Sequence, residues 1–157
     1  MTPAELQSTL RASGIYAVGF GGANYQLPTL AWLQNTFYPA MRQELFGEGI
    51  TAWSQAFNCR LFTLDALVFA DKCDAETVNA APGTDTLAIG SFWFVPDAAR
   101  FGNSETPGLL AGTYSGEGHA ILCCVTDQGI KFLDPQSNTI WALSAAELNS
   151  QRLTFFP

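Results

Sequence analysis

Two apolar runs joined by a short polar turn constrain this chain more than any other stretch. The first run is His119–Val125, the turn is Asp127-Gln128-Gly129, and the second run, Ile130–Leu133, leads into Asp134-Pro135. Apolar runs on either side of a short, glycine-containing turn indicate an antiparallel β-hairpin. Because such a hairpin brings its open ends together, we expect His119 and Asp134 to be neighbours in space.

An imidazole beside a carboxylate can serve as a general base. The carboxylate orients one ring nitrogen and leaves the other facing a nucleophile. His119 is the only histidine of the chain. A lone histidine before an apolar strand is often structural, so the chemistry depends on whether the chain also supplies a nucleophile.

The order of the other elements indicates the fold class. We expect helices from Thr2 to about Ser13, from Pro28 to Phe46 with a break at Pro39, and from Asn58 to Ala70, the last ending in a charged turn at Asp71–Asp74. Strands are expected at residues 86–95, at 139–143 and, as a final edge strand, at 153–156, with a short helix beginning at Ser144. Helices first and strands later predict an α+β fold with a mainly antiparallel sheet, in one domain spanning residues 1–157.

Four cysteines compete for the role of nucleophile. Cys123 and Cys124 lie inside an apolar strand, where a thiol behaves as a small buried hydrophobic group. Cys73 has acidic neighbours, which disfavour a thiolate. Cys59 follows Asn58, a good helix N-cap, and the backbone N–H groups and dipole of a helix N-terminus lower the pKa of a thiol. Cys59 is therefore the expected nucleophile.

The sequence around these residues resembles a known superfamily. Gly118-His119-Ala120 followed by Phe132–Gln136 is similar to the signature G-H-A … (F/Y)-x-(D/E)-P-Q, and Phe57–Thr63 is similar to the helix start F-D-C-D-D-F-A. These motifs belong to papain-fold domains of the papain-like cysteine peptidase superfamily, found in phage-encoded proteins and at the C-terminus of a fungal agglutinin. Arg60 and Leu61 depart from the pattern, because the related sequences have acidic residues there.

The resemblance implies a papain-like fold, with the nucleophile helix packed on the sheet, and a Cys59–His119–Asp134 triad. It implies a thiol hydrolase, a peptidase or amidase, which acts on a peptide or amide substrate through an acyl-enzyme. Gln136 or Gln55 would stabilise the oxyanion or orient the site. Trp141 would shield the histidine and aspartate from solvent, although core packing explains a tryptophan there equally well.

Other functions remain open at this point. A catalytically silent interaction protein on the same fold, of a kind phages encode, is one, and a transglutaminase-like acyltransferase is another. A zinc site would have enough ligands in Cys59, Cys73, His119 and either Cys123 or Cys124. Their spacing matches no common zinc pattern, so we expect no metal and no cofactor.

Composition limits the partners. Hydrophobic residues make up 48% of the chain and charged residues 13%, which excludes a disordered chain. The net charge of −7 argues against nucleic acid and against an anionic membrane surface. The absence of a membrane-length apolar stretch and of a signal-peptide pattern favours a cytoplasmic location. Asp97, Glu105 and Glu117, in a long loop, would favour a basic substrate if they faced the site.

Overall fold

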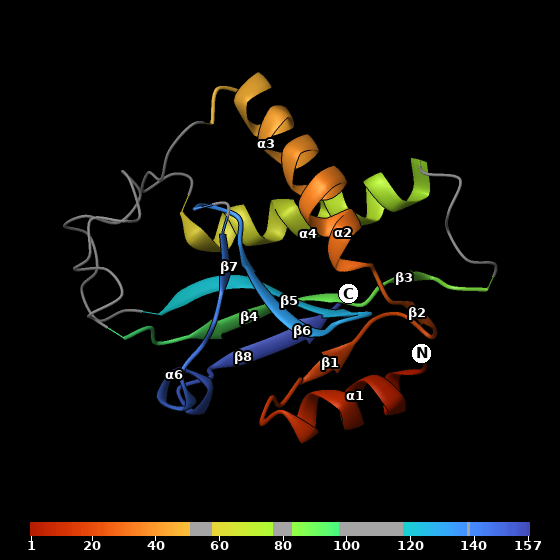
Figure 1. Ribbon diagram of the computed structural model, residues 1–157, viewed down its shortest axis with the longest axis vertical. Helices are drawn as coiled ribbons and strands as arrows, with labels where there is room; N and C mark the ends of the chain where they lie inside the picture. Colours follow the sequence, from red (N-terminus) through yellow and green to blue (C-terminus); the bar gives the residue numbers. More distant parts are fainter. Residues whose placement is uncertain (51–57, 77–82, 98–117, 138) are drawn as a thin grey trace.

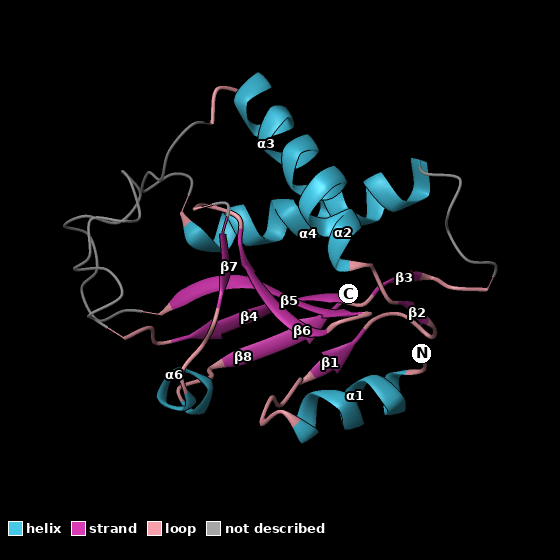
Figure 2. Ribbon diagram, in the orientation of Figure 1, coloured by secondary structure: helices cyan, strands magenta, loops and turns pink. Residues whose placement is uncertain are grey.

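The computed structural model describes residues 1–50, 58–76, 83–97, 118–137 and 139–157. In this part of the chain, helices pack on a six-stranded sheet of order β1-β8-β4-β5-β6-β7 (Figures 1 and 2). The strands are β1 (Gly19–Phe20), β4 (Ile89–Phe94), β5 (His119–Thr126), β6 (Gly129–Asp134), β7 (Thr139–Trp141) and β8 (Leu153–Phe156). All neighbouring pairs are antiparallel except β1 and β8. The predicted α+β fold with a mainly antiparallel sheet is confirmed.

The helices cover both faces of this sheet. Figure 1 shows α3 and α4 on one face and α1 on the other. The helical segments are α1 (Pro3–Ala12), α2 (Leu30–Trp32), a π-helical turn (Leu33–Phe37), α3 (Tyr38–Gly47), α4 (Cys59–Glu76) and α6 (Ala145–Asn149). A second, parallel pair consists of β2 (Tyr25–Gln26) and β3 (Thr86–Leu87).

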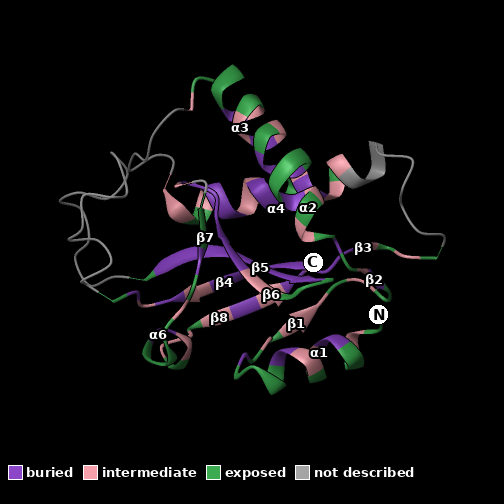
Figure 3. Ribbon diagram, in the orientation of Figure 1, coloured by how far each residue is buried: buried purple, intermediate pink, exposed green. Residues whose placement is uncertain are grey.

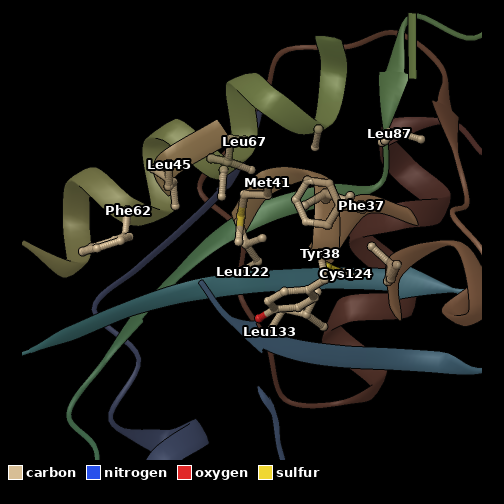
Figure 4. Close-up of a cluster of buried hydrophobic side chains, with 14 residues drawn as sticks. Phe37, Tyr38, Met41, Leu45, Phe62, Leu67, Leu87, Leu122, Cys124 and Leu133 are labelled. Atoms are coloured by element: carbon tan, nitrogen blue, oxygen red, sulfur yellow. The ribbon is translucent and has the colours of Figure 1, made fainter. Parts of the chain in front are cut away.

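Two apolar cores lie on the two faces, and β5 contributes to both. Leu122 and Cys124 pack with residues of α3 and α4, while Ile121 and Cys123 pack with the α1 side. Figure 4 shows Leu122 and Cys124 beneath the helical side chains of the first core. The alternation follows from the two-residue repeat of a strand. Every residue of β5 is buried, as Figure 3 shows, so this strand of the hairpin lies in the interior of the molecule.

Local capping signals place the short helices as expected. Thr2 and Ser144 each form a capping box with a glutamate three residues later. The segment from Pro28 is divided near Pro39, where the π-helical turn ends just before α3, whose second residue is the proline. Proline lacks the N–H of a regular helix and its ring crowds the preceding turn, so a locally widened turn relieves the clash.

Three expectations about element limits are wrong. The charged turn at Asp71–Asp74 is helical, because α4 continues to Glu76 with Lys72 paired to Glu44 at 3.2 Å. The strand expected at 86–95 is two strands, since β3 pairs with β2 and β4 pairs with β5. The strand at 153–156 is not an edge strand: β8 lies between β1 and β4. Each error arises from pairing between distant segments.

The hairpin has the predicted turn. β5 and β6 pair from Thr126 and Gly129 inward, and Gly129 has a φ of 83°, which glycine adopts without strain. The Asp127 carboxylate accepts a hydrogen bond of 2.8 Å from the backbone N–H of Leu30. The turn therefore also caps the start of α2. No helix in the described ranges combines the length and the hydropathy needed to span a lipid bilayer.

Candidate functional site

His119 and Asp134 lie side by side at the open end of the hairpin. The β5–β6 register pairs Leu122 with Leu133. If this register is continued three residues toward the open end, His119 lies opposite Gln136. Asp134 comes two residues before Gln136 and therefore faces the same side of the sheet as His119. Nε2 of His119 is 3.6 Å from Oδ2 of Asp134, and the two side chains are 4% and 0% exposed. The hairpin geometry thus brings this imidazole and carboxylate together.

The Asp134 carboxylate is held by its own turn. The backbone N–H of Gln136 donates to Oδ1 at 3.0 Å, and the Ser137 hydroxyl donates to Oδ2 at 2.7 Å. The buried hydroxyl of Tyr38 donates to the backbone carbonyl of Asp134 at 2.6 Å. These contacts fix the acid before any charge develops on the imidazole.

Trp141 covers the imidazole. Its ring lies 5.2 Å from that of His119, centroid to centroid, with the two planes inclined by 28°. Phe94 contacts His119 edge-on at 6.2 Å. The contact is compatible with the shielding expected of Trp141, and the same ring belongs to the core on the α1 side. Trp141 thus packs in the core and against the imidazole, and its shielding role stays a prediction.

Cys59 is the first residue of α4, as its position after Asn58 predicts. The Asn58 side chain accepts hydrogen bonds from the backbone N–H groups of Arg60 at 3.2 Å and Leu61 at 3.4 Å. Burial alone would raise the pKa of the Cys59 thiol. Its hydrogen bond to His119, the charge on that imidazole and the backbone N–H groups of Ala120 and Arg60 outweigh burial and lower the pKa.

The histidine is shifted in the complementary direction. Burial opposes a charged imidazole, but the Asp134 carboxylate and the Cys59 thiolate outweigh it and raise the pKa of His119 from 6.5 to about 9. When a thiol pKa is lowered beside an imidazole whose pKa is raised, transfer of the proton from sulfur to nitrogen is favoured. The opposite directions of the two shifts therefore favour transfer of the Cys59 proton to the imidazole of His119, which the Asp134 carboxylate accompanies.

The other cysteines lack this environment. Cys123 and Cys124 are fully buried, and burial raises the pKa of both thiols. Cys73 lies partly buried along α4. Within the described residues, no three His, Cys, Asp or Glu side chains gather closely enough to hold a metal ion.

The Cys59 thiol opens into a cleft of about 350 Å³. Its described lining is Cys59, Arg60, Trp93, Gly118, His119, Ala120 and Arg152. Sequence reasoning missed Trp93 and Arg152. The β4–β8 register pairs Trp93 with Leu153, so Arg152 arrives beside Trp93 through a contact between strands that are far apart in the chain. No local pattern could have indicated it.

The two glutamines expected to assist the site have different outcomes. Gln55 lies outside the described residues. The Gln136 side chain is completely buried, forms no hydrogen bond within the described residues and is not part of the described cleft lining. The backbone N–H groups of Arg60 and Ala120 help to lower the pKa of the Cys59 thiol, and that of Arg60 also donates to the Asn58 side chain.

Comparison with known proteins gives a fold but no family. No protein-family model matches the chain, and no curated protein sequence matches it. The chain is similar to the solved structure of Polyporus squamosus lectin bound to the human-type influenza-binding epitope Neu5Aca2-6Galb1-4GlcNAc, with a TM-score of 0.66 and 17% identity over 99% of this chain and 49% of that one. It is also similar to a structure described as a PSL1a-E64 complex, with a TM-score of 0.64, 17% identity and coverage of 99% and 51%. The chain spans about half the length of the chains that it matches.

These comparisons correct the assignment made from the short motifs. Identification as a papain-like cysteine peptidase, phage-related or otherwise, is wrong, because the matching structures are those of a lectin and neither is named as a peptidase. The expected thiol hydrolase function and the peptide or amide substrate are overturned with it. The motif blocks are short and local, whereas the structural match extends over almost the whole chain.

Proposed function

We propose that the cleft is a site of covalent chemistry in which Cys59 is the nucleophile. His119 accepts the thiol proton, and Asp134 orients and charges the imidazole. The observation that carries the proposal is that the chain's one histidine meets a helix-N-terminal thiol in a cleft and shifts its pKa downward. Thiolates are the reactive form of cysteine, so this arrangement favours attack on an electrophilic carbon.

Each neighbouring group has a part in this chemistry. The Cys59 thiolate supplies the electron pair for the new carbon–sulfur bond. One carbon–oxygen bond of the reactant, the π bond of a carbonyl or a ring bond of an epoxide, breaks and leaves its electron pair on that oxygen, which the proton on His119 can neutralise. The N–H groups of Ala120 and Arg60 stabilise negative charge at the sulfur and, as the bond forms, at an adjacent oxygen of the reactant. Trp141 restricts water at the imidazole and keeps its attraction to Asp134 strong.

One comparison supports the proposal directly. The structure described as a PSL1a-E64 complex shares the fold over 99% of this chain. E64 carries an epoxide, and an epoxide is an electrophile that thiolates open to form a thioether. E64 is therefore a suitable probe for Cys59, alongside simpler alkylating agents.

The test is the alkylation rate of Cys59 by iodoacetamide at pH 6, followed by peptide mass spectrometry. N-acetylcysteine is the reference thiol, since almost none of it is thiolate at that pH. We expect Cys59 to react at least about tenfold faster than the reference and to form the E64 adduct. His119→Gln should reduce the rate at least about tenfold, and Cys73→Ser should leave it unchanged.

A pH–rate profile of the wild-type protein makes the test independent of variants that fold poorly. The rate at Cys59 should persist below pH 7, where that of an ordinary thiol falls tenfold per pH unit. A Cys59 rate no greater than that of N-acetylcysteine across pH 6–8 would rule out the proposed thiolate.

The proposal includes a papain-like chain topology. A papain-like topology in a single domain, 1–157, is supported by the cysteine at the N-terminus of α4, the histidine at the start of β5 and the aspartate at the end of β6. A shared chain topology does not imply peptidase activity.

Carbohydrate binding is the second candidate function. The match to a lectin solved with a sialylated epitope favours it, and Trp93 offers an aromatic surface in the cleft. Because the match covers only 49% of the lectin chain, the proposal includes the assumption that the matched half contributes to binding. Calorimetric titration with that sialylated trisaccharide tests it: saturable heat that Trp93→Ala abolishes supports binding, and no heat at millimolar glycan opposes it.

A further inference from the structure

We propose that the cleft selects reactants that carry a carboxylate next to the electrophilic carbon, and that Arg60 and Arg152 bind this carboxylate. The inference rests on the proposed role of Cys59 as the nucleophile. It adds the chemical class of the reactant, which the thiol, imidazole and acid do not define by themselves.

The two arginines reach the cleft from different elements. Arg60 is the second residue of α4, directly after Cys59. Arg152 lies between α6 and β8, where its backbone N–H donates to the carbonyl of Trp93 at 2.7 Å. Both residues are exposed and both line the cleft with Cys59. A reactant held at the sulfur would therefore have guanidinium groups from two sides of the cleft within reach.

Gly118 makes room for one of these groups. A Cβ at Gly118 would lie 3.3 Å from Nη1 of Arg152 and 3.7 Å from its Cδ. The guanidinium therefore lies over the backbone directly before His119, and the absence of a side chain at Gly118 lets it approach. Arg152 therefore lines the cleft beside the residue that precedes His119.

The charges of the site explain why the arginines matter. With the thiolate and imidazolium of the proposed function, Cys59, His119 and Asp134 would together carry one net negative charge, which alone would repel an anion. The two arginines change this to one net positive charge. No Asp or Glu from the described residues lines the cleft or forms an ion pair with either arginine. Guanidinium groups bind carboxylates with two parallel hydrogen bonds, so a carboxylate is the fitting anion.

The local charge is opposite to that of the whole chain. The sequence has 14 acidic and seven basic residues, and two of those seven line this cleft. The expectation of a basic substrate rested on Asp97, Glu105 and Glu117. Asp97 is exposed and is not in the described lining, while Glu105 and Glu117 lie outside the described residues. The experiment uses the full chain, so any effect of that loop is included in the measured rates.

Iodoacetate and iodoacetamide form a matched pair of probes. Both lose iodide to a thiolate and form a thioether, and they differ in that one carries a carboxylate and the other a neutral amide. The quantity to measure is the ratio of the Cys59 alkylation rates, iodoacetate over iodoacetamide, at low ionic strength. For N-acetylcysteine, which has no cation nearby, this ratio reports the intrinsic preference of a thiolate.

We expect the wild-type ratio to exceed that of N-acetylcysteine by about tenfold or more, and to fall when salt is added, because salt screens exposed charges. Arg60→Gln and Arg152→Gln should each lower the ratio about threefold or more, and the double variant should lower it further. Arg11→Gln removes the same charge from the exposed end of α1 and should leave the ratio unchanged.

The two proposals fail in different ways. Iodoacetamide alkylation no faster than that of N-acetylcysteine would overturn the nucleophilic role of Cys59, and this inference with it. Fast iodoacetamide alkylation with a ratio that the double arginine variant leaves unchanged would overturn the carboxylate preference alone. A lower ratio in Arg11→Gln equal to that in Arg152→Gln would also overturn it, since the effect would then come from net charge and not from the cleft.

Discussion

Nε2 of His119 lies 3.6 Å from Oδ2 of Asp134, although both side chains are almost completely removed from solvent. Burying two charges costs solvation energy, and hydrogen bonds to the remaining lone pairs are needed to offset it. Asp134 has such bonds from Ser137 and from the backbone of Gln136. The two side chains are therefore held in place by the fold. Removing one of them should leave the other buried without its opposite charge.

Asp134→Asn should lower the pKa of His119 by more than about one unit from its value of about 9. The amide keeps the shape of the acid but removes the negative charge that offsets burial of the imidazolium. Because the chain has one histidine, a single imidazole signal in an NMR titration reports the result. Asp65→Asn, on α4 away from the cleft, is the control. An unchanged His119 pKa in Asp134→Asn would show that this carboxylate is not the main stabilising charge.

The stability of Cys59→Ser should fall as the pH rises from 6.5 to 8. The folded pKa of His119 lies above its unfolded value of 6.5, so its contribution is complete below pH 6.5 and is lost as the pH rises through about 9. The pKa of Cys59 is lowered from 9.0, so its contribution is present above pH 9 and is lost as the pH falls through its folded value. At any pH above both 6.5 and the folded pKa of Cys59 and below 9, the two slopes have opposite signs and offset each other in the wild-type protein.

Removing the thiol leaves only the histidine slope, whose limit for one group is about 1.4 kcal/mol per pH unit. Because Cys59 is one of the groups that raise the pKa of His119, this slope ends at a lower pH in the variant than the wild-type value of about 9 implies. Urea unfolding at several pH values measures it, with the difference between Cys59→Ser and wild type removing the contributions of all other groups. Cys73→Ser should keep the wild-type pH dependence. Parallel curves for Cys59→Ser and wild type would contradict the thiolate–imidazolium pair.

Tyr38→Phe should destabilise the protein by about 1–2 kcal/mol. The change removes the buried hydroxyl that donates to the Asp134 carbonyl at 2.6 Å and leaves that carbonyl without its partner. Equilibrium unfolding in urea measures the loss. Tyr16→Phe, at a side chain 63% exposed, should change the unfolding free energy by less than about 0.5 kcal/mol. Equal effects of the two substitutions would exclude a specific role for the Tyr38 hydrogen bond.

Gly90→Ala should destabilise the protein by about 3 kcal/mol. A Cβ there would lie 2.5 Å from the carbonyl oxygen of Phe155 and 2.8 Å from the ring of Phe156. β4 cannot move away easily, because β5 pairs on its other side. Gly47→Ala, at the end of α3 with nothing within 4 Å of the new methyl group, should be neutral or slightly stabilising. Thermal unfolding of both variants tests the contrast, and similar melting temperatures would refute it.

Much of the site's framework was predictable from the sequence because local signals encode it. The Asp127–Gly129 turn set the hairpin register and hence the proximity of His119 and Asp134. Asn58 marked the start of the helix that carries Cys59. Turn and cap preferences depend on a few adjacent residues, so they can be read without knowing the rest of the fold.

The known structures that share this fold were not predictable in the same way. The motif blocks around Cys59, His119 and Asp134 resemble those of papain-like peptidases, yet the structures that match the chain are those of a lectin. A few residues around a cysteine and a histidine describe a local constellation. The reactant that such a constellation takes depends on the surrounding cleft, to which distant parts of the chain contribute.

The sequence by itself determined the α+β class, the hairpin and the helix start at Cys59, since these follow from hydrophobic periodicity, turn residues and caps. Only the tertiary structure decided that β8 lies between β1 and β4, and that this pairing carries Arg152 to Trp93 and into the cleft beside Cys59. Pairing between distant strands depends on the packing of the whole sheet, and no local run of residues specifies it. The lowered pKa of the Cys59 thiol also depends on the contact between α4 and β5. Burial at this contact raises the pKa, and the hydrogen bond and charge of His119 help to outweigh burial.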